Sequence, residues 1–153
     1  MLRRIAPIAL TLYIAFVFIQ SLFFKFTDSP ETQYIFGTLE AWGTSLGWPG
    51  LFAHDGIFSQ YVVGTGELIA SALLLAGLRV PVLRPLGALM ALGVISGAIF
   101  FHLFTPLGVS VLNADGTHDG GELFALACGV WVAAALLLWM SRDVIGRLPV
   151  RKG

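Results

Sequence analysis

The sequence predicts an all-α membrane protein: an antiparallel four-transmembrane-helix bundle with a short amphipathic outer helix between the first and second spans. The first observation is composition, because 57% of the 153 residues are hydrophobic and only 12% are charged, whereas a soluble domain averages about 25% charged residues. The second is the presence of long apolar segments, and the third is the separation of basic from acidic segments. We interpret residues 1–153 as a single integral membrane domain.

Net charge and cysteine content exclude several classes of function. The formal net charge is zero, so nothing indicates a nucleic-acid partner. The single cysteine, Cys128, excludes an intrachain disulfide and a Cys-x-x-Cys redox pair. Because Cys128 lies among apolar residues, we expect it to be an inert packing residue.

Four apolar segments are candidates for membrane spans, at about residues 5–26, 57–78, 82–104 and 122–141. Each is close to the roughly 20 residues that cross a bilayer. The first could also be a signal peptide, but no small-residue cleavage site follows it. The second is the least certain from hydropathy, because it contains Glu67.

The distribution of basic residues favours all four spans. Cytoplasmic segments of membrane proteins are enriched in lysine and arginine. With four spans, one side receives Arg3, Arg4, Arg79, Arg84, Arg142, Arg147, Arg151 and Lys152. Lys25 alone lies toward the other side. We therefore expect a multi-pass protein of a bacterial-type cytoplasmic (inner) membrane, embedded in its lipid bilayer, with both termini in the cytoplasm.

A helix start follows the first predicted span. Ser29 is a cap residue, Pro30 suits the first turn, and Glu31 suits the positive end of a helix dipole. Tyr34, Ile35, Leu39 and Trp42 could share one face. We expect a short amphipathic helix on the outer membrane surface, and the alternative is a tucked loop.

Five polar side chains fall in the outer half of the predicted bundle, with at least one from each span: Gln20, Lys25, Glu67, His102 and Glu122. Lipid cannot satisfy such groups, so we expect them to converge on one ligand-binding pocket that opens to the outer side. Lys25 is the natural counter-ion of Glu67. Two alternatives remain open: the pair only locks two helices together, or Glu67 is protonated.

The polar residues around the last span also have structural interpretations. His102 could hydrogen-bond a neighbouring helix, bind a metal or move protons, and we expect no metal because the helices lack a Glu-x-x-His pair. Asp119 and Glu122 have capping-box spacing, in which Asp119 accepts from the amide of Glu122. Gly120 and Gly121 would allow the sharp turn before the helix.

Small and aromatic residues complete the predicted bundle. Gly93 and Gly97 form a G-x-x-x-G pattern that is typical of close helix packing, within one bundle or between subunits of a homo-oligomer. Phenylalanines surround the polar level, at Phe23, Phe24, Phe26, Phe100, Phe101 and Phe104. They form a core by default, but they could also line a slot for a flat ring such as a quinone.

These parts together resemble the DoxX-like membrane proteins. The segments that carry the resemblance are FIQSLFFKF, GTGELIASALLLAG, LGALMALGVISGAIFFHL and DGGELFALACGVW. The resemblance implies a four-helix membrane fold, and for some members a link to thiosulfate:quinone oxidoreduction or to thiol and oxidative-stress complexes. It supplies no catalytic residue set, and thiol chemistry does not transfer because Cys128 is alone.

Three classes of function follow from these observations. The first is a subunit or accessory of a redox pathway, with a redox protein as partner and a quinone-like or other small apolar ligand in the outer pocket. The second is a proton-coupled transporter, and the third is a non-catalytic structural membrane partner. An aromatic pocket open to lipid favours the first, a water-filled path to the cytoplasm the second, and a filled bundle with Glu67 paired the third.

Overall fold

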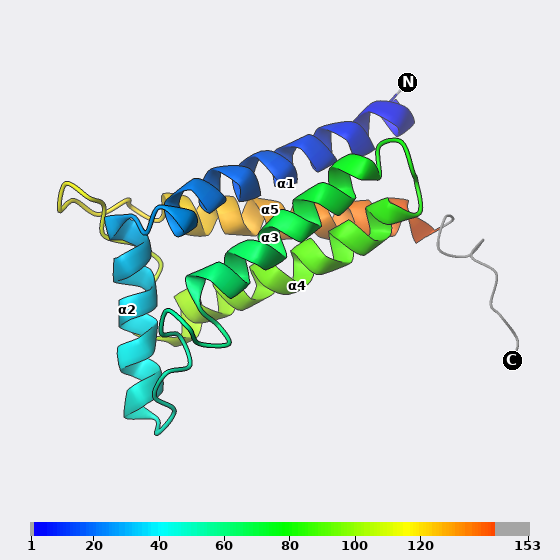
Figure 1. The fold of residues 1–153 in the computed structure, drawn as a ribbon. Helices are drawn as coiled ribbons and strands as arrows, with labels where there is room; N and C mark the ends of the chain where they lie inside the picture. Colours follow the sequence, from blue (N-terminus) through cyan, green and yellow to red (C-terminus); the bar gives the residue numbers. More distant parts are fainter. Residues whose placement is uncertain (1, 143–153) are drawn as a thin grey trace, which may run out of the picture.

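The computed structural model describes residues 2–142, with side chains from Ile5 onward, and this part of the chain is helical apart from its connections. The helices are α1 Leu2–Phe26, α2 Pro30–Ser45, α3 Gln60–Ala76, α4 Leu83–Phe104 and α5 Glu122–Met140 (Figure 1). The all-α prediction and the additional helix after the first span are confirmed. The basic residues predicted at positions 147, 151 and 152 lie outside the described residues.

Helices α1, α3, α4 and α5 lie side by side and close into a ring of contacts (Figure 1). α1 packs on α3 and α5, and α4 packs on the same two helices. The centre of the ring is filled by large side chains between alanines: Ile14, Phe18, Leu74, Ala88, Ala91, Val130, Ala134 and Leu137. The alanines bring the helix backbones close together, so the interior is packed with apolar atoms.

Three of these helices, α1, α4 and α5, are long and apolar enough to cross a membrane, and α3 is a shorter apolar helix. α3 begins later than predicted because Ser59 caps it, accepting a hydrogen bond from the amide of Val62 at 3.4 Å. It ends before the predicted residue 78, at Ala76, where Gly77 takes the cap position. The other predicted spans agree with the observed helices to within a few residues.

The start of α2 is the one that the sequence predicts. Ser29 accepts a hydrogen bond from the amide of Thr32 at 3.3 Å, and Pro30 is the first helical residue. α2 lies steeply across one end of the other helices (Figure 1). Its inner face packs on a small second core in which Leu39, Phe52 and Leu107 are buried.

The Gly93 and Gly97 pair does not pack within the described part of the chain, and its packing between subunits stays a prediction. A side chain at Gly93 or Gly97 would meet nothing within 4 Å, so these residues make no close helix contact within the described chain. Between α3 and α4 a tight approach lies at Gly87, where a Cβ would stand 2.8 Å from the backbone nitrogen of Leu74. Gly87 therefore sets the separation of α3 and α4.

Candidate functional site

The main polar contact between the helices joins Lys25 of α1 to Glu67 of α3. The Lys25 Nζ lies 3.1 Å from Glu67 Oε1 and 3.0 Å from Oε2, and it also donates to the hydroxyl of Ser21. The side chains are only 15% and 7% exposed. At Gly64 the two helices come close, because a Cβ there would lie 3.5 Å from Cδ of Lys25.

Gln60 extends this contact and was missed by the sequence analysis. It is buried, and its Nε2 donates to the carbonyl of Lys25 at 3.0 Å and to Asp28 Oδ1 at 2.9 Å. The amide therefore satisfies an otherwise free carbonyl at the end of α1. The spacing offers a signal for it, since residues seven apart on a helix share a face and Gln60 precedes Glu67 by that interval.

His102 serves the connection that follows α4. Its Nδ1 lies 2.6 Å from the carbonyl oxygen of Gly108, and the imidazole packs on Phe124 of α5 with ring centroids 5.7 Å apart. The contact to a carbonyl requires a proton on Nδ1. The ring is buried, and these two contacts hold the start of the 105–121 connection against the bundle.

The other two predicted site residues lie apart from these contacts. Gln20 and Glu122 are exposed, and neither side chain makes a hydrogen bond within the described part of the chain. Of the predicted set, the structure brings Lys25 and Glu67 together. Among the same described residues, no group of three or more His, Cys, Asp or Glu side chains gathers to hold a metal ion.

The cap before α5 differs from the predicted capping box. Gly121, with φ of 91°, occupies the cap position, and Asp119 accepts from the amide of Leu123 at 3.0 Å rather than from that of Glu122. The Glu122 amide instead lies 3.3 Å from the Asp119 carbonyl. Because Gly120 (φ 63°) and Gly121 are both left-handed, the turn carries the side chain of Asp119 one residue further along.

Asp119 also holds two segments of the 105–121 connection together. Its Oδ1 accepts from the amides of Val111 at 2.8 Å and Gly121 at 2.9 Å. Partial burial raises the pKa of this carboxyl, but the hydrogen bonds from Gly121, Leu123, Val111 and Ser110 outweigh it, so the pKa lies below its usual value. The carboxylate form of Asp119 is thus the one that holds the loop.

We expect Asp119→Ala to lower the free energy of opening of the 105–121 connection by about 1 kcal/mol at neutral pH, because a helix cap contributes about that much. A lowered folded pKa contributes stability above the unfolded pKa and loses it as pH falls through the folded value. The difference between wild type and variant should therefore shrink in acid. Hydrogen exchange at the amides of Val111, Gly121 and Leu123 measures it.

Asp115→Asn is the control for this change. Asp115 accepts from Thr117, at 2.9 Å from the amide and 2.6 Å from the hydroxyl. Its effect should stay within its own turn. Equal protection of the Leu123 amide in Asp119→Ala and wild type would contradict the role given to Asp119.

Glu40 fixes the connection between α2 and α3, and sequence patterns gave no sign of it. Its Oε1 accepts from the amide of Gly50 at 2.6 Å and its Oε2 from the amide of Phe52 at 2.9 Å. These two bonds, that from Gly50 first, lower the pKa of the Glu40 carboxyl. Acidic residues outside the packed helices thus hold loop backbone.

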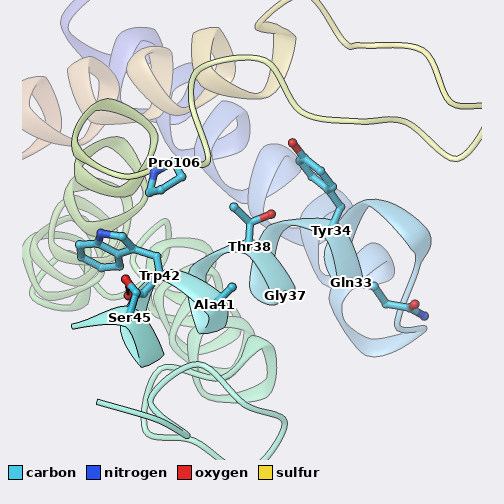
Figure 2. Close-up of a pocket in the computed structure, with 8 residues that line it drawn as sticks. All are labelled: Gln33, Tyr34, Gly37, Thr38, Ala41, Trp42, Ser45 and Pro106. Carbon is cyan, nitrogen blue, oxygen red and sulfur yellow. Dashed lines mark hydrogen bonds between the residues drawn. The ribbon is translucent and has the colours of Figure 1, made fainter. Parts of the chain in front are cut away.

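A shallow surface hollow of about 630 Å³ lies against α2, away from the predicted polar residues. It is lined by Gln33, Tyr34, Gly37, Thr38, Ala41, Trp42, Ser45 and Pro106. Figure 2 shows these α2 side chains with Pro106 of the 105–121 connection opposite them. Its aromatic side chains, Tyr34 and Trp42, could contact a small apolar molecule.

Comparison with known proteins gave no relative. A scan against protein-family models, a search of curated proteins and a search of solved structures each found no match.

Proposed function

We propose that the chain is a four-span protein of a bacterial-type cytoplasmic membrane, DoxX-like in architecture, that acts as a non-catalytic accessory subunit of a membrane complex. In this proposal α1, α3, α4 and α5 cross the bilayer in alternating directions. α2 lies on the outer surface, and both termini are cytoplasmic. The partner is either another membrane protein or a second copy of the chain. For the first case, the DoxX-like resemblance suggests a redox protein.

Charge supports the proposed orientation. Arg79 and Arg84 lie in or beside the connection 77–82, and Arg142 follows α5. The Arg142 guanidinium lies 5.1 Å from the ring centre of Trp139. Tryptophan beside a basic residue is typical of a membrane–water interface on the cytoplasmic side.

The Lys25–Glu67 ion pair carries the proposed accessory role. Redox or transport chemistry needs polar groups that face a substrate. Here both oxygens of Glu67 contact Lys25, and the buried imidazole of His102 contacts a backbone carbonyl. These groups are used to hold helices and connections together, which favours a protein that presents surfaces to a partner.

The hollow on α2 favours a second candidate function. Tyr34 and Trp42 are aromatic side chains beside an open depression, which suits a quinone-like or other small apolar ligand of a redox pathway. This candidate keeps the ligand predicted from the sequence but moves its site from the bundle to α2. A proton-coupled transporter has no comparable observation in its favour.

Cysteine labelling in intact cells tests the topology. A single cysteine at Asp115, in a Cys128→Ser background, is expected to react with an impermeant thiol reagent, and one at Arg79 is not. Both positions are exposed, so reactivity reports the side of the membrane. Labelling at Arg79 from outside would contradict the four-span arrangement.

Gentle purification from the native membrane tests the function. Mass spectrometry of the bound proteins, lipids, quinones and metals is expected to find a membrane-protein partner, or a second copy of the chain, in simple stoichiometry. A stoichiometric quinone on the isolated single chain would contradict the accessory role and favour the second candidate.

A further inference from the structure

Residues 46–58, which make up all but the last residue of the connection between α2 and α3, carry large apolar side chains that no part of the described chain covers. Leu46 is 57% exposed, Trp48 66%, Ile57 69% and Phe58 45%. Figure 1 shows the second half of α2 and this connection projecting to one side of the packed helices, with the connection on the bundle side of α2. Such a patch normally marks a contact with a protein or a membrane.

We propose that the 46–58 loop is seated in the outer leaflet of the bilayer, with Leu46, Trp48, Ile57 and Phe58 among the lipid chains just below the head groups. The occupant of this apolar surface is therefore lipid. The inference rests on the four-span arrangement proposed above, and it adds a second anchoring element to the spanning helices.

Helix lengths place the loop at this depth. α3 has 17 residues and α4 has 22, and the short connection 77–82 keeps their inner ends level. The difference, 22 − 17 = 5 residues, amounts to about 7.5 Å at 1.5 Å per residue. The outer end of α3 therefore lies below that of α4, close to the outer boundary of a hydrocarbon core of about 30 Å.

Aromatic contacts bring the loop beside the last turns of α4. Phe52 packs on Phe101 with ring centroids 5.2 Å apart, and it stacks on Phe58 at 6.0 Å. Phe101 lies three residues before Phe104, the last residue of α4. Phe104 is 67% exposed. The loop thus lies at the depth of apolar side chains that the four-span arrangement exposes to lipid.

Part of the loop backbone is hydrogen-bonded within the chain. Lipid offers no hydrogen bonds, so irregular backbone at membrane depth must be satisfied internally. The amides of Gly50 and Phe52 donate to Glu40, that of Trp48 donates to the Gly43 carbonyl at 3.0 Å, and that of Phe58 donates to the Leu51 carbonyl at 3.0 Å.

Polar side chains of the loop are grouped at one place. His54 and Asp55 are adjacent and exposed. The His54 Nε2 lies 3.0 Å from the hydroxyl of Tyr61 in the first turn of α3. We place this pair at the head groups, where polar side chains remain hydrated while the apolar ones on either side enter the leaflet.

Depth-dependent fluorescence quenching tests the proposal. Trp48→Cys and Ile57→Cys, each in a Cys128→Ser background, are labelled with bimane and reconstituted into phosphatidylcholine vesicles. Part of the lipid carries a nitroxide on the acyl chain near the head group. Both sites are expected to emit at shorter wavelength than in water and to be quenched by the lipid nitroxide but only weakly by aqueous iodide.

Two further positions are the controls. Phe23 on α1 is 73% exposed and reports lipid on a spanning helix. Ala41 is exposed on α2, and it lies about 200° around the helix from the buried Leu39. Quenching by lipid at Trp48 and Ile57 should match that at Phe23 and exceed that at Ala41 several-fold.

The outcomes separate the two proposals. Strong iodide quenching at Trp48 and Ile57, with lipid quenching at Phe23, would overturn the loop anchor and leave the spanning helices in place. Loss of lipid quenching at Phe23 as well would overturn both. Disulfide cross-linking between two Trp48→Cys chains, without lipid quenching, would assign the surface to a second copy and overturn the lipid contact.

Discussion

Lys25→Ala is expected to lower the free energy of unfolding by about 3 kcal/mol, because it leaves the carboxylate of Glu67 buried without its counter-ion. Glu67→Gln is expected to cost only about 1 kcal/mol. The glutamine can still hydrogen-bond, and the flexible Lys25 side chain at the end of α1 can extend toward water. Unfolding in detergent with a graded denaturant, followed by circular dichroism, measures both values.

Two variants serve as controls for this comparison. Gln20→Ala removes an exposed polar side chain from the same helix and should leave stability unchanged. The double variant Lys25→Met/Glu67→Gln removes both charges and should lie closer to wild type than Lys25→Ala. Equal stability of Lys25→Ala and wild type would show that the pair does not hold α1 to α3.

Gly87→Ala is expected to destabilise the protein by about 2 kcal/mol, because overpacking forces backbones apart. A Cβ at Gly87 would stand 2.8 Å from the backbone nitrogen of Leu74 and 2.9 Å from its Cγ. A flexible side chain could move, but the backbone of α3 cannot shift without disturbing its other contacts. The same denaturant titration measures the change.

Gly93→Ala is the matched control, since it is the same substitution on the same helix at a position with nothing within 4 Å. It should be neutral or stabilise by up to about 1 kcal/mol, because alanine favours helix over glycine. A loss of stability at Gly93 equal to that at Gly87 would contradict the packing of α3 on α4 described above.

The sequence predicts the helices well because their signals are local. Hydropathy marks the long apolar segments, and the Ser29–Pro30 pair marks the start of α2. The counter-ion of Glu67 could be predicted for a different reason: Lys25 is the only basic residue on its side of the proposed membrane, so charge balance leaves a single choice.

The remaining contacts depend on how distant segments meet, which local patterns do not encode. Glu40 accepts hydrogen bonds from the amides of Gly50 and Phe52 because the chain folds back against α2. The capping box failed at Glu122 because two successive left-handed glycines redirect the chain before α5. Backbone conformation at that turn, rather than residue spacing, decides which amide the cap side chain reaches.

We propose that the Lys25–Glu67 pair in the bundle is structural and that the protein acts through its partners. Native mass spectrometry of complexes extracted in mild detergent tests it, with wild type compared to Lys25→Met/Glu67→Gln. Both proteins are predicted to carry the same protein partners in the same stoichiometry. A stoichiometric quinone or other small molecule on wild type, absent from a double variant that still folds, would contradict the claim and assign the pair to a ligand site.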